Sequence, residues 1–376
     1  MKIIYISENK IYKCENGKIA ELPSERVLHY TGTIAQINKN KEWKNSGTGA
    51  EFMGAAVHPG SEENAYVNIN GVAAGGLGIV YSMRLGDMGG IYSKSIDNPN
   101  EAEAHIFTGM NTNISTISIK NDRIATSIDG HLAVSDFKGN LDEITDGDSR
   151  EEDPSWSLTD NRIFCTTAGL ARDSRGIIAA VSPRSIMAVD LDGGSIKELY
   201  SDEDYDFLKP KNNSHGNLYY IKQPYKAPQE KDPLWKDILL FPFRILKAIG
   251  GFLNAFSVIF GGESLQSGKK HGDVKTKQKS DKELYLEGKL LEAEKNEKEN
   301  SAKGDKNPGI LPVNRVLVRT EADGKETVIK RGVLDYTVLD NGDIICSNGK
   351  ALIRIGEGGE EIIAKAKLAH SICVIK

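Results

Sequence analysis

Three segments between residues 130 and 199 repeat one pattern of strands and turns. They read G-H-L-A-V-S-D-F-K-G-N-L-D-E-I-T-D-G from Gly130, D-P-S-W-S-L-T-D-N-R-I-F from Asp153 and S-I-M-A-V-D-L-D-G-G-S-I-K-E-L from Ser185. Apolar and polar residues alternate in the first and third segments, which is typical of half-buried β-strands. Gly139 and Gly193 fall at hairpin turns, where glycine adopts a positive φ without strain. Such a unit cannot bury its own apolar face, so a chain that repeats it must stack the copies.

The segment Asp153-Pro154-Ser155-Trp156-Ser157, followed by Arg162-Ile163, resembles the propeller repeat of the TolB family. In that repeat Pro-x-Trp-Ser-Pro-Asp-Gly precedes a buried strand, and residues 186–199 match the hairpin that closes it. Leu158-Thr159-Asp160 stands here in place of Pro-Asp-Gly, so the resemblance is to a diverged member. The resemblance implies a β-propeller and a role in protein–protein interaction.

Strand patterns and turn signals along the rest of the chain predict six blades of four strands each. The first blade has three strands, at residues 2–7, 10–14 and 18–22, and its missing inner strand is expected at 370–376. The other blades are expected at residues 66–108, 114–145, 153–199, 207–329 and 333–364. The predicted fold is therefore all-β, a six-bladed β-propeller closed by its N- and C-terminal strands, because closure removes exposed sheet edges.

Two segments interrupt the strand pattern. Residues 24–44 are predicted to form a helix, because Ser24 is a suitable N-cap and apolar residues follow at near-helical spacing. The second is an insertion at residues 225–313 in blade five, which leaves propeller segments at 1–224 and 314–376. Residues 267–307 of it are rich in Lys and Glu and are expected to be mostly disordered, with a short helix at 282–296 opened by a capping box.

The apolar part of the insertion, residues 238–260, is long enough to span a membrane. The flanking strands belong to one blade, however, so the chain must leave and return on the same side, and Arg244 and Lys247 would make a span costly. An interfacial helix with a thin polar stripe fits better. Three contacts remain open for it: the propeller itself or a homo-oligomer, a membrane surface, and another protein partner. The residues expected to make that contact are Trp235, Phe241, Phe243, Arg244, Lys247, Phe252 and Phe256.

The connectivity of a propeller predicts which loops share a face. The turn between the second and third strands of a blade emerges on the same face as the connection to the next blade. The insertion, the helical segment 24–64 and a blade-four loop with Arg172 and Arg175 should therefore lie on one face. Because loops on rigid scaffolds carry function, we expect this to be the working face.

Composition narrows the function. The net charge of −5 argues against a nucleic-acid partner. The four cysteines are scattered in or beside apolar runs, where a free thiol packs as a small hydrophobe. The N-terminus has no signal-peptide pattern, which predicts a cytoplasmic protein, peripheral at the inner face of the membrane if the insertion meets lipid. Acidic clusters at residues 146–153 and 202–206 are expected in connections between blades.

Two functions remain open from the sequence. No nucleophile elbow, local metal motif or cofactor motif is present, so no catalytic residue, cofactor or metal is predicted. The favoured hypothesis is a non-catalytic scaffold that docks a protein partner, a second copy or a membrane surface through the face that carries these loops. The alternative is an enzyme or small-ligand sensor that uses the central channel on that same face. Polar side chains converging on the propeller axis around an empty pocket would favour this alternative.

Overall fold

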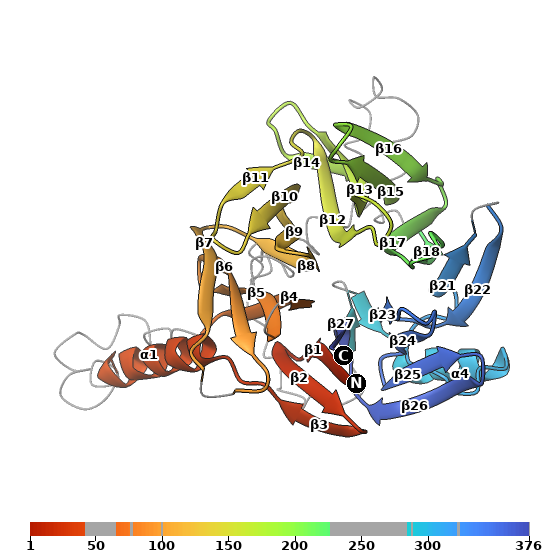
Figure 1. Cartoon of the computed structure of the whole chain (residues 1–376), viewed down its shortest axis with the longest axis horizontal. Helices are drawn as coiled ribbons and strands as arrows, with labels where there is room; N and C mark the ends of the chain where they lie inside the picture. The colour runs from red at the N-terminus through yellow and green to blue at the C-terminus, as the bar shows by residue number, and fades with distance from the viewer. Residues whose placement is uncertain are drawn as a thin grey trace, which may run out of the picture.

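A computed structural model of the chain describes residues 1–41, 65–75, 78–98, 101–225, 284–286, 289–321 and 324–375. Six sheets of four or five strands surround a central axis, which confirms the predicted six-bladed β-propeller (Figure 1).

The first three blades are built as follows, from the axis outward. Blade one consists of β27 (His370–Ile375), β1 (Lys2–Ser7), β2 (Lys10–Glu15) and β3 (Lys18–Glu21). Blade two consists of β4 (Val67–Gly75), β5 (Gly78–Leu85), β6 (Met88–Ser95) and β7 (Ala104–Met110). Blade three consists of β8 (Ile114–Lys120), β9 (Arg123–Ile128), β10 (His131–Asp136) and β11 (Leu141–Glu143).

The other three blades follow the same plan. Blade four consists of β12 (Ser149–Trp156), β13 (Arg162–Arg172), β15 (Ser185–Asp190) and β16 (Ser195–Tyr200), with β14 (Ile178–Val181) paired to the end of β13. Blade five consists of β17 (Tyr205–Asn212), β18 (Leu218–Pro224), β21 (Val316–Thr320) and β22 (Glu326–Arg331). Blade six consists of β23 (Asp335–Val338), β24 (Ile344–Ser347), β25 (Ala351–Gly356) and β26 (Gly359–Lys365).

The two ends of the chain close the ring. The C-terminal strand β27 pairs antiparallel with the N-terminal strand β1, as the strand count of blade one predicts. The six innermost strands then contact one another in a ring, β27 to β4, β8, β12, β17, β23 and back to β27. Each blade therefore has neighbours on both sides, and no blade edge is left open at the join.

The core lies between the blades. Each of the six blade-to-blade interfaces holds its own cluster of buried apolar side chains. Trp156, which is 4% exposed, packs at the interface between blades three and four with Leu132 and Ile163. Successive buried residues of a strand face opposite interfaces, as Ile3 and Ile4 of β1 do, because a sheet sandwiched between two neighbours buries apolar residues on both faces.

A buried carboxylate anchors the helix α1 (Glu25–Lys41) to blade two. Glu103 accepts hydrogen bonds from Ser24 Oγ at 3.0 Å and from the backbone N–H groups of Glu25 and Arg26 at 3.1 and 3.3 Å. Ser24 also caps the helix, as predicted, by accepting from Val27 N at 3.3 Å. A negative charge at a helix N-terminus satisfies free N–H groups and complements the helix dipole.

The prediction for the end of the insertion is wrong. Residues 284–286 and 289–291 form a two-stranded hairpin, β19 (Leu284–Leu286) and β20 (Lys289–Leu291), and the helix α4 follows at Ala293–Ala302. The segment after α4 is ordered because buried amides hold it. Asn300 is 0% exposed and donates to the carbonyl oxygens of Gly309 and Leu311 at 3.0 and 2.8 Å.

An ionic contact also joins this segment to the propeller. The buried Lys330 Nζ in β22 lies 2.8 Å from Asp305 and 2.9 Å from Glu360 in β26. The Lys/Glu-rich composition indicated disorder at residues 297–307, beyond the predicted helix, but polar side chains here serve as tertiary contacts between the segment and blades five and six.

A second correction concerns the acidic residues before Pro154. The sequence placed them in a connection between blades, but β12 already begins at Ser149 and includes Glu151 and Glu152. Glu151 is 4% exposed, and its carboxylate accepts hydrogen bonds from the hydroxyls of Thr145 and Ser149 at 2.7 and 2.6 Å. These donors replace water, so the charged strand residue can be buried.

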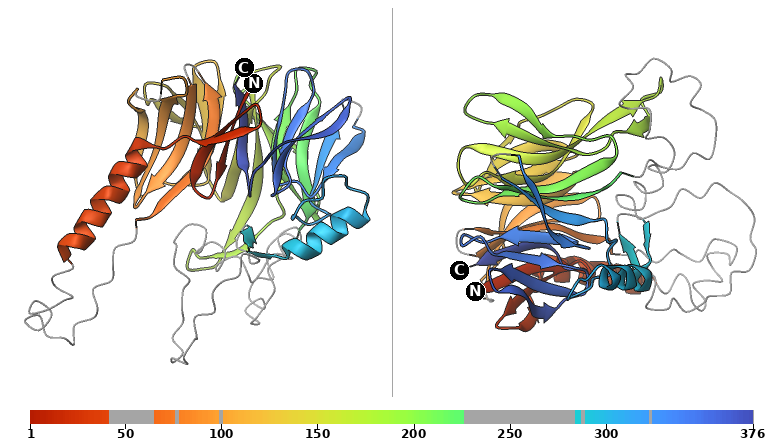
Figure 2. Two further views of the ribbon diagram at one scale, coloured as in Figure 1. Left: turned by 90° about the horizontal axis from the view of Figure 1, so that it is seen from below. Right: turned by 90° about the vertical axis from the view of Figure 1, so that its right-hand side faces the viewer.

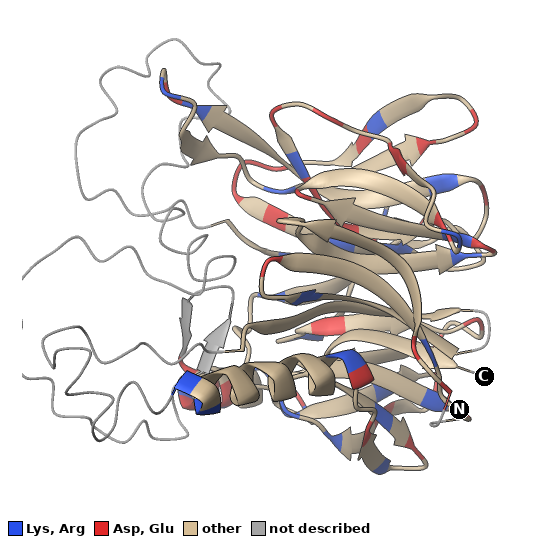
Figure 3. Cartoon of the chain, turned by 90° about the vertical axis from the view of Figure 1, so that its left-hand side faces the viewer, with Lys and Arg blue, Asp and Glu red and all other residues tan. Residues whose placement is uncertain are grey.

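The two faces of the propeller differ as predicted. The helices α1 and α4 and the β13–β14 hairpin extend from one face, and both termini lie at the other (Figure 2). We call the first the decorated face and the second the terminal face. On the side shown in Figure 3, Lys and Arg are interspersed with Asp and Glu along the blades, and the charges of α1 lie at its two ends.

Candidate functional site in the central channel

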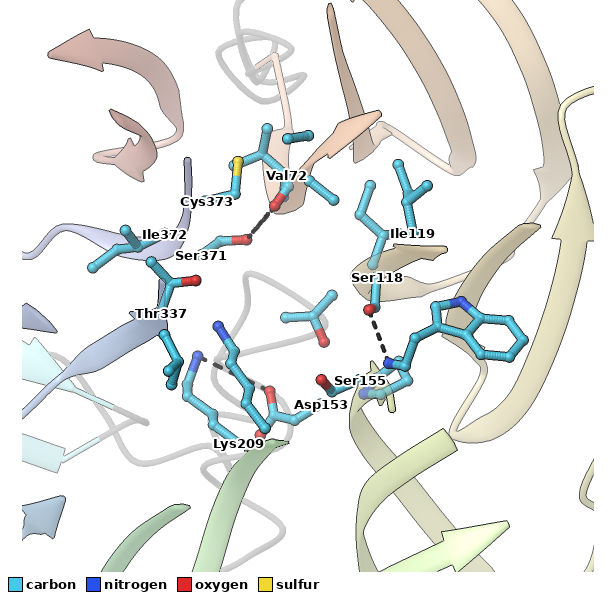
Figure 4. Close-up of a pocket in the computed structure, with 18 of the residues that line it drawn as sticks. Val72, Ser118, Ile119, Asp153, Ser155, Lys209, Thr337, Ser371, Ile372 and Cys373 are labelled. Atoms are coloured by element: carbon cyan, nitrogen blue, oxygen red, sulfur yellow. Dashed lines mark hydrogen bonds and ion pairs between the residues drawn. The ribbon is translucent and has the colours of Figure 1, made fainter. Parts of the chain in front are cut away.

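A cavity of about 320 Å³ occupies the central channel. All six innermost strands contribute to its wall, so residues from every blade converge on it (Figure 4). Five charged residues line the cavity: Lys120, Asp153, Lys209, Lys211 and Asp335. Three lysines against two aspartates leave one positive charge.

The cavity lies toward the terminal face. Its wall is formed by the later parts of the inner strands, residues 72–74 of β4, 116–120 of β8, 153–156 of β12 and 209–212 of β17. The inner strands all run toward the face where the C-terminal end of β27 lies (Figure 2). The expectation that channel and loops share a working face is therefore wrong. The cavity is displaced toward the opposite end of the channel.

β-Bulges aim polar side chains into this cavity. The pairing of β12 with β13 shifts between Glu152 and Ser155, and that of β17 with β18 shifts between Leu208 and Lys211. Each shift leaves a residue with a positive φ before a proline, Asp153 at 51° and Lys209 at 54°. The prolines lie in the unpaired part of the bulge, where their missing N–H breaks no ladder bond. Bulges re-aim side chains, and here they turn both charged residues toward the axis (Figure 4).

The conformation of Lys209 is held from several directions. A left-handed backbone is uncommon for a residue with a long side chain, and strain of this kind persists only where the surroundings enforce it. Lys209 N donates to Thr166 Oγ1 at 3.3 Å, and its carbonyl oxygen accepts from the hydroxyl of Tyr336 at 2.6 Å. Its ammonium lies 3.0 Å from Asp335 Oδ2 and 4.0 Å from Asp153 Oδ1.

Asp335 is the most strongly held carboxylate of the channel. Its side chain is 2% exposed, and it accepts hydrogen bonds from the backbone N–H groups of Tyr336, at 2.7 Å, and Ser371. Burial raises the pKa of Asp335, but Lys209, Lys211 and these hydrogen bonds outweigh burial and lower the pKa to about 2. The carboxylate therefore stays ionised at any physiological pH.

Asp153 and Lys209 differ in whether neighbouring charges outweigh the effect of burial on the pKa. Burial raises the pKa of Asp153, and the positive charge of Lys209 only partly opposes that shift. Burial lowers the pKa of Lys209, but the two carboxylates outweigh it, so that pKa is raised. Lys209 is thus held as a cation between Asp335, whose pKa is lowered, and Asp153, whose pKa is raised.

Lys211, like Lys120, has no acidic partner among the described residues. Its Nζ donates to the carbonyl oxygen of Tyr336 at 2.6 Å and lies 5.2 Å from the ring centre of the same residue. Among the described residues, no carboxylate oxygen lies within 4.0 Å of this nitrogen. Burial lowers the pKa of Lys211, and the neighbouring charge of Lys209 adds to the effect while Asp335 opposes it.

The remaining polar groups of the wall are used mainly to join blades. Ser371 Oγ accepts from Val72 N at 2.8 Å, which ties β27 to β4. Ser118 Oγ accepts from Trp156 N at 3.1 Å, which ties β8 to β12. Lys120 Nζ donates to the carbonyl oxygens of Ser157, at 2.7 Å, and Asp160. Of the three lysines in the cavity wall, Lys211 therefore has the fewest polar partners among the described residues.

The two arginines predicted on the decorated face lie at the β13–β14 hairpin, as expected. Arg172 Nε lies 3.0 Å from Asp148, and Arg175 forms an ion pair of 2.9 Å with Asp173. Both charges are thus partnered within the chain. An exposed arginine of this kind is available to a partner only if its ion pair rearranges.

The contact residues predicted in the insertion, Trp235 to Phe256, lie outside the described residues, so their roles stay predictions. Among the residues that the structure describes, no helix has the length and apolarity of a membrane span. In the same part of the chain, no three His, Cys, Asp or Glu residues are grouped to hold a metal ion. All four cysteines are free, and three are buried.

The strand order and the channel define a six-bladed β-propeller with a charged axial cavity. Among solved structures the chain is similar to TolB from Acinetobacter baumannii, at 8% identity and a TM-score of 0.47, over 99% of this chain and 66% of that one. It is also similar to a luciferin-regenerating enzyme, at 9% identity and a TM-score of 0.42, over 81% and 77% of the two chains.

A gluconolactonase from Xanthomonas campestris matches at 11% identity and a TM-score of 0.38, over 80% of this chain and 75% of that one. No protein-family model and no curated protein sequence matches the chain. TolB is thus among the structural neighbours, as the repeat motif indicated. At such identities the similarity concerns architecture, and function must be inferred from the channel itself.

Sequence reasoning missed the channel residues, although one signal for them was present. Asp153-Pro154 and Lys209-Pro210 occupy the same bulge position in adjacent blades. A charged residue before proline, repeated within inner strands, indicates a bulge rather than a regular ladder. Asp335 and Lys211 carry no such signal, because only the ring closure brings them to the same cavity.

Proposed function

We propose that this protein binds a small organic anion in its central channel. The observation that carries the proposal is Lys211, an ammonium group in the wall of a closed-ring cavity with no carboxylate of the described chain within 4.0 Å. Lys211 is partly buried, and withdrawing a cation from water is costly unless an anion pairs with it. The cavity has a net positive lining, and its volume lies at the small end of the range of ligand sites, about 300–1,000 Å³.

The rigidity of the site supports the same function. Lys209 and Asp335 are fixed by their ion pair and by hydrogen bonds with two other blades, because Lys209 N donates to Thr166 Oγ1 in blade four and Ser371 N in blade one donates to Asp335. The cavity is therefore formed without a ligand. A ligand that enters such a site does not have to order it, which favours affinity. The half-buried apolar side chain of Ile119 in the cavity wall suits the hydrocarbon part of a small carboxylate (Figure 4).

Isothermal titration with acetate, lactate and benzoate tests this function. We expect saturable binding to the full chain, loss of binding in Lys211→Met, which preserves most of the side-chain volume, and unchanged binding in Lys197→Met. Lys197 is an exposed lysine of β16 and serves as the matched control. Equal titration curves for all three proteins, or no heat with any of the three anions, would contradict the proposal.

The two-faced architecture supports a second function, docking of a partner on the decorated face. The helices α1 and α4 and the β13–β14 hairpin gather there (Figure 2), whereas the cavity is lined by the later parts of the inner strands. In this proposal residues 238–260 meet a membrane surface, a second copy or another protein. Replacing residues 232–283 with a short Gly/Ser linker preserves α4 and its anchors.

Liposome co-sedimentation and light scattering of the full chain and this replacement distinguish the outcomes. Pelleting of the full chain alone with anionic liposomes supports membrane docking. An oligomeric full chain and a monomeric replacement support assembly through the insertion. Identical behaviour in both assays counts against docking through residues 232–283.

A further inference from the structure

The cavity wall contains an amine whose pKa is lowered, Lys211, and a carboxyl whose pKa is raised, Asp153. Lys211 lines the cavity, donates to the carbonyl oxygen of Tyr336 at 2.6 Å and has no ion pair among the described residues, and burial lowers its pKa, which favours the neutral amine. Asp153 lies in the wall of the same cavity, and its pKa is raised, so its neutral acid is accessible. Titratable groups of one cavity whose pKa values are shifted by burial and by specific neighbouring charges are typical of a functional site.

The other lysines of the cavity are unsuited to react. Lys209 is held as a cation 3.0 Å from Asp335, so its nitrogen has no free electron pair. Lys120 directs its ammonium at the carbonyl oxygens of Ser157 and Asp160. Lys211 donates to a single carbonyl oxygen, that of Tyr336, at 2.6 Å. A neutral amine makes this hydrogen bond with one N–H and keeps its lone pair for a ligand.

We propose that Lys211 forms an imine with the carbonyl carbon of a small oxo acid bound in the channel. The inference rests on the proposed anion site, because it takes the ligand to be an organic anion and adds a carbonyl group to it. Lysines that are desolvated and lie beside another cationic group are the ones that form Schiff bases. Lys211, with Lys209 two residues away on the same strand, meets both conditions.

The step balances without an oxidant or a further reactant. The Lys211 nitrogen attacks the carbonyl carbon, the C=O π bond opens, and the oxygen takes up a proton that the nitrogen gives up. The resulting carbinolamine hydroxyl takes a proton from the Asp153 carboxyl and leaves as water while the C=N bond forms. The iminium N–H proton can then return to the Asp153 carboxylate. Lys209 stabilises that carboxylate from 4.0 Å.

Borohydride trapping with pyruvate tests the inference in the full chain. Borohydride reduces an imine to a stable secondary amine, and peptide mass spectrometry identifies the modified lysine. We expect pyruvate to label Lys211 and to leave Lys209, Lys120 and the exposed Lys197 unlabelled at low reagent excess. Lys211→Arg retains the positive charge but cannot form an imine, so it should lose the label, with circular dichroism as the check that it folds.

A second variant tests the acid. Asp153→Asn should slow labelling of Lys211 by pyruvate by about 10²-fold, the usual contribution of a general acid, with circular dichroism as the check that this variant folds. Labelling spread evenly over surface lysines, or no label at Lys211, overturns the imine. If acetate still binds in that case, the anion site stands without the imine. If neither acetate binding nor labelling occurs, both proposals fail.

Discussion

Lys209 and Asp335 form an ion pair of 3.0 Å across the join between blades five and six, although 126 residues separate them in the chain. Asp335 also accepts from Ser371 N in blade one, and Tyr336 donates its hydroxyl to the carbonyl oxygen of Lys209. The carboxylate of Asp335 thus joins blades five, six and one. The residues that line the cavity at this point also help to close the ring of blades.

Substitution of this carboxylate should therefore destabilise the whole propeller. Asp335→Asn leaves the Lys209 ammonium without its close partner, and removal of one member of a buried pair costs about 3 kcal/mol or more. Urea unfolding followed by circular dichroism measures the loss. The control is Asp173→Asn, which removes an ion pair to Arg175, a side chain 74% exposed, and should cost less than about 1 kcal/mol. Similar costs for the two variants would show that the channel pair is not buried as described.

The two channel aspartates should have opposite effects on the pH dependence of stability. The pKa of Asp335 is lowered from its ordinary 3.8 to about 2, so its contribution is complete above the unfolded pKa and is lost as the pH falls from about 4 to about 2. The pKa of Asp153 is raised, so its contribution is present at low pH and is lost as the pH rises through its folded pKa.

Asp335→Asn should consequently flatten the acid side of the stability profile, by about 2 kcal/mol for a shift of this size. Asp153→Asn should leave the acid limb in place and cost little at neutral pH. Unfolding free energies from urea titrations at a series of pH values between 2 and 8 measure both. An unchanged acid limb in Asp335→Asn would contradict the assignment.

The closing strand offers a test of ring integrity. Ile372 in β27 is 2% exposed and packs in the cluster between blades six and one. Ile372→Ala should lower the unfolding free energy by about 3 kcal/mol, as for other buried isoleucines, and deletion of residues 369–376 should abolish cooperative thermal unfolding. Ile362→Ala, on the outer strand β26 and 53% exposed, is the matched control and should cost less than about 1 kcal/mol. Unchanged melting of the deletion variant would refute closure by β27.

The contacts that Glu103 makes with the N-terminus of α1 can be tested separately from the stability of the propeller. Glu103→Gln keeps one acceptor oxygen but loses the charge that faces the N-terminus of α1 and the buried Lys94, whose Nζ lies 3.4 Å away. We expect faster amide exchange in the first turn of α1, by about tenfold if one charge-assisted bond of roughly 1.5 kcal/mol is lost. Hydrogen exchange with mass spectrometry measures the effect, and the exposed Glu101→Gln should leave exchange of α1 unchanged. Equal protection in both variants would mean that Ser24 alone holds the helix.

The sequence by itself determined the architecture. Strand alternation, Gly turns and the Pro154-Ser155-Trp156-Ser157 motif are local signals, and each blade repeats them. The count of three strands at the N-terminus and one at the C-terminus was enough to predict how the ring closes, because an unpaired inner strand is costly. Local signals failed at residues 282–296, where the pattern is compatible with more than one structure and the tertiary contacts of Asn296 and Asn300 decide.

Only the tertiary structure decided which polar groups meet at the axis. Asp153, Lys209 and Asp335 lie in three different blades, and nothing in their own neighbourhoods places them together. The bulges before Pro154 and Pro210 shift the pairing of their strands, and a shift of one residue moves a side chain from one face of a strand to the other. Ring closure brings Lys209 next to Asp335, whereas Lys211 has no carboxylate within 4.0 Å among the described residues. Their pKa values follow from that burial, which is a property of the assembled propeller and of no single segment.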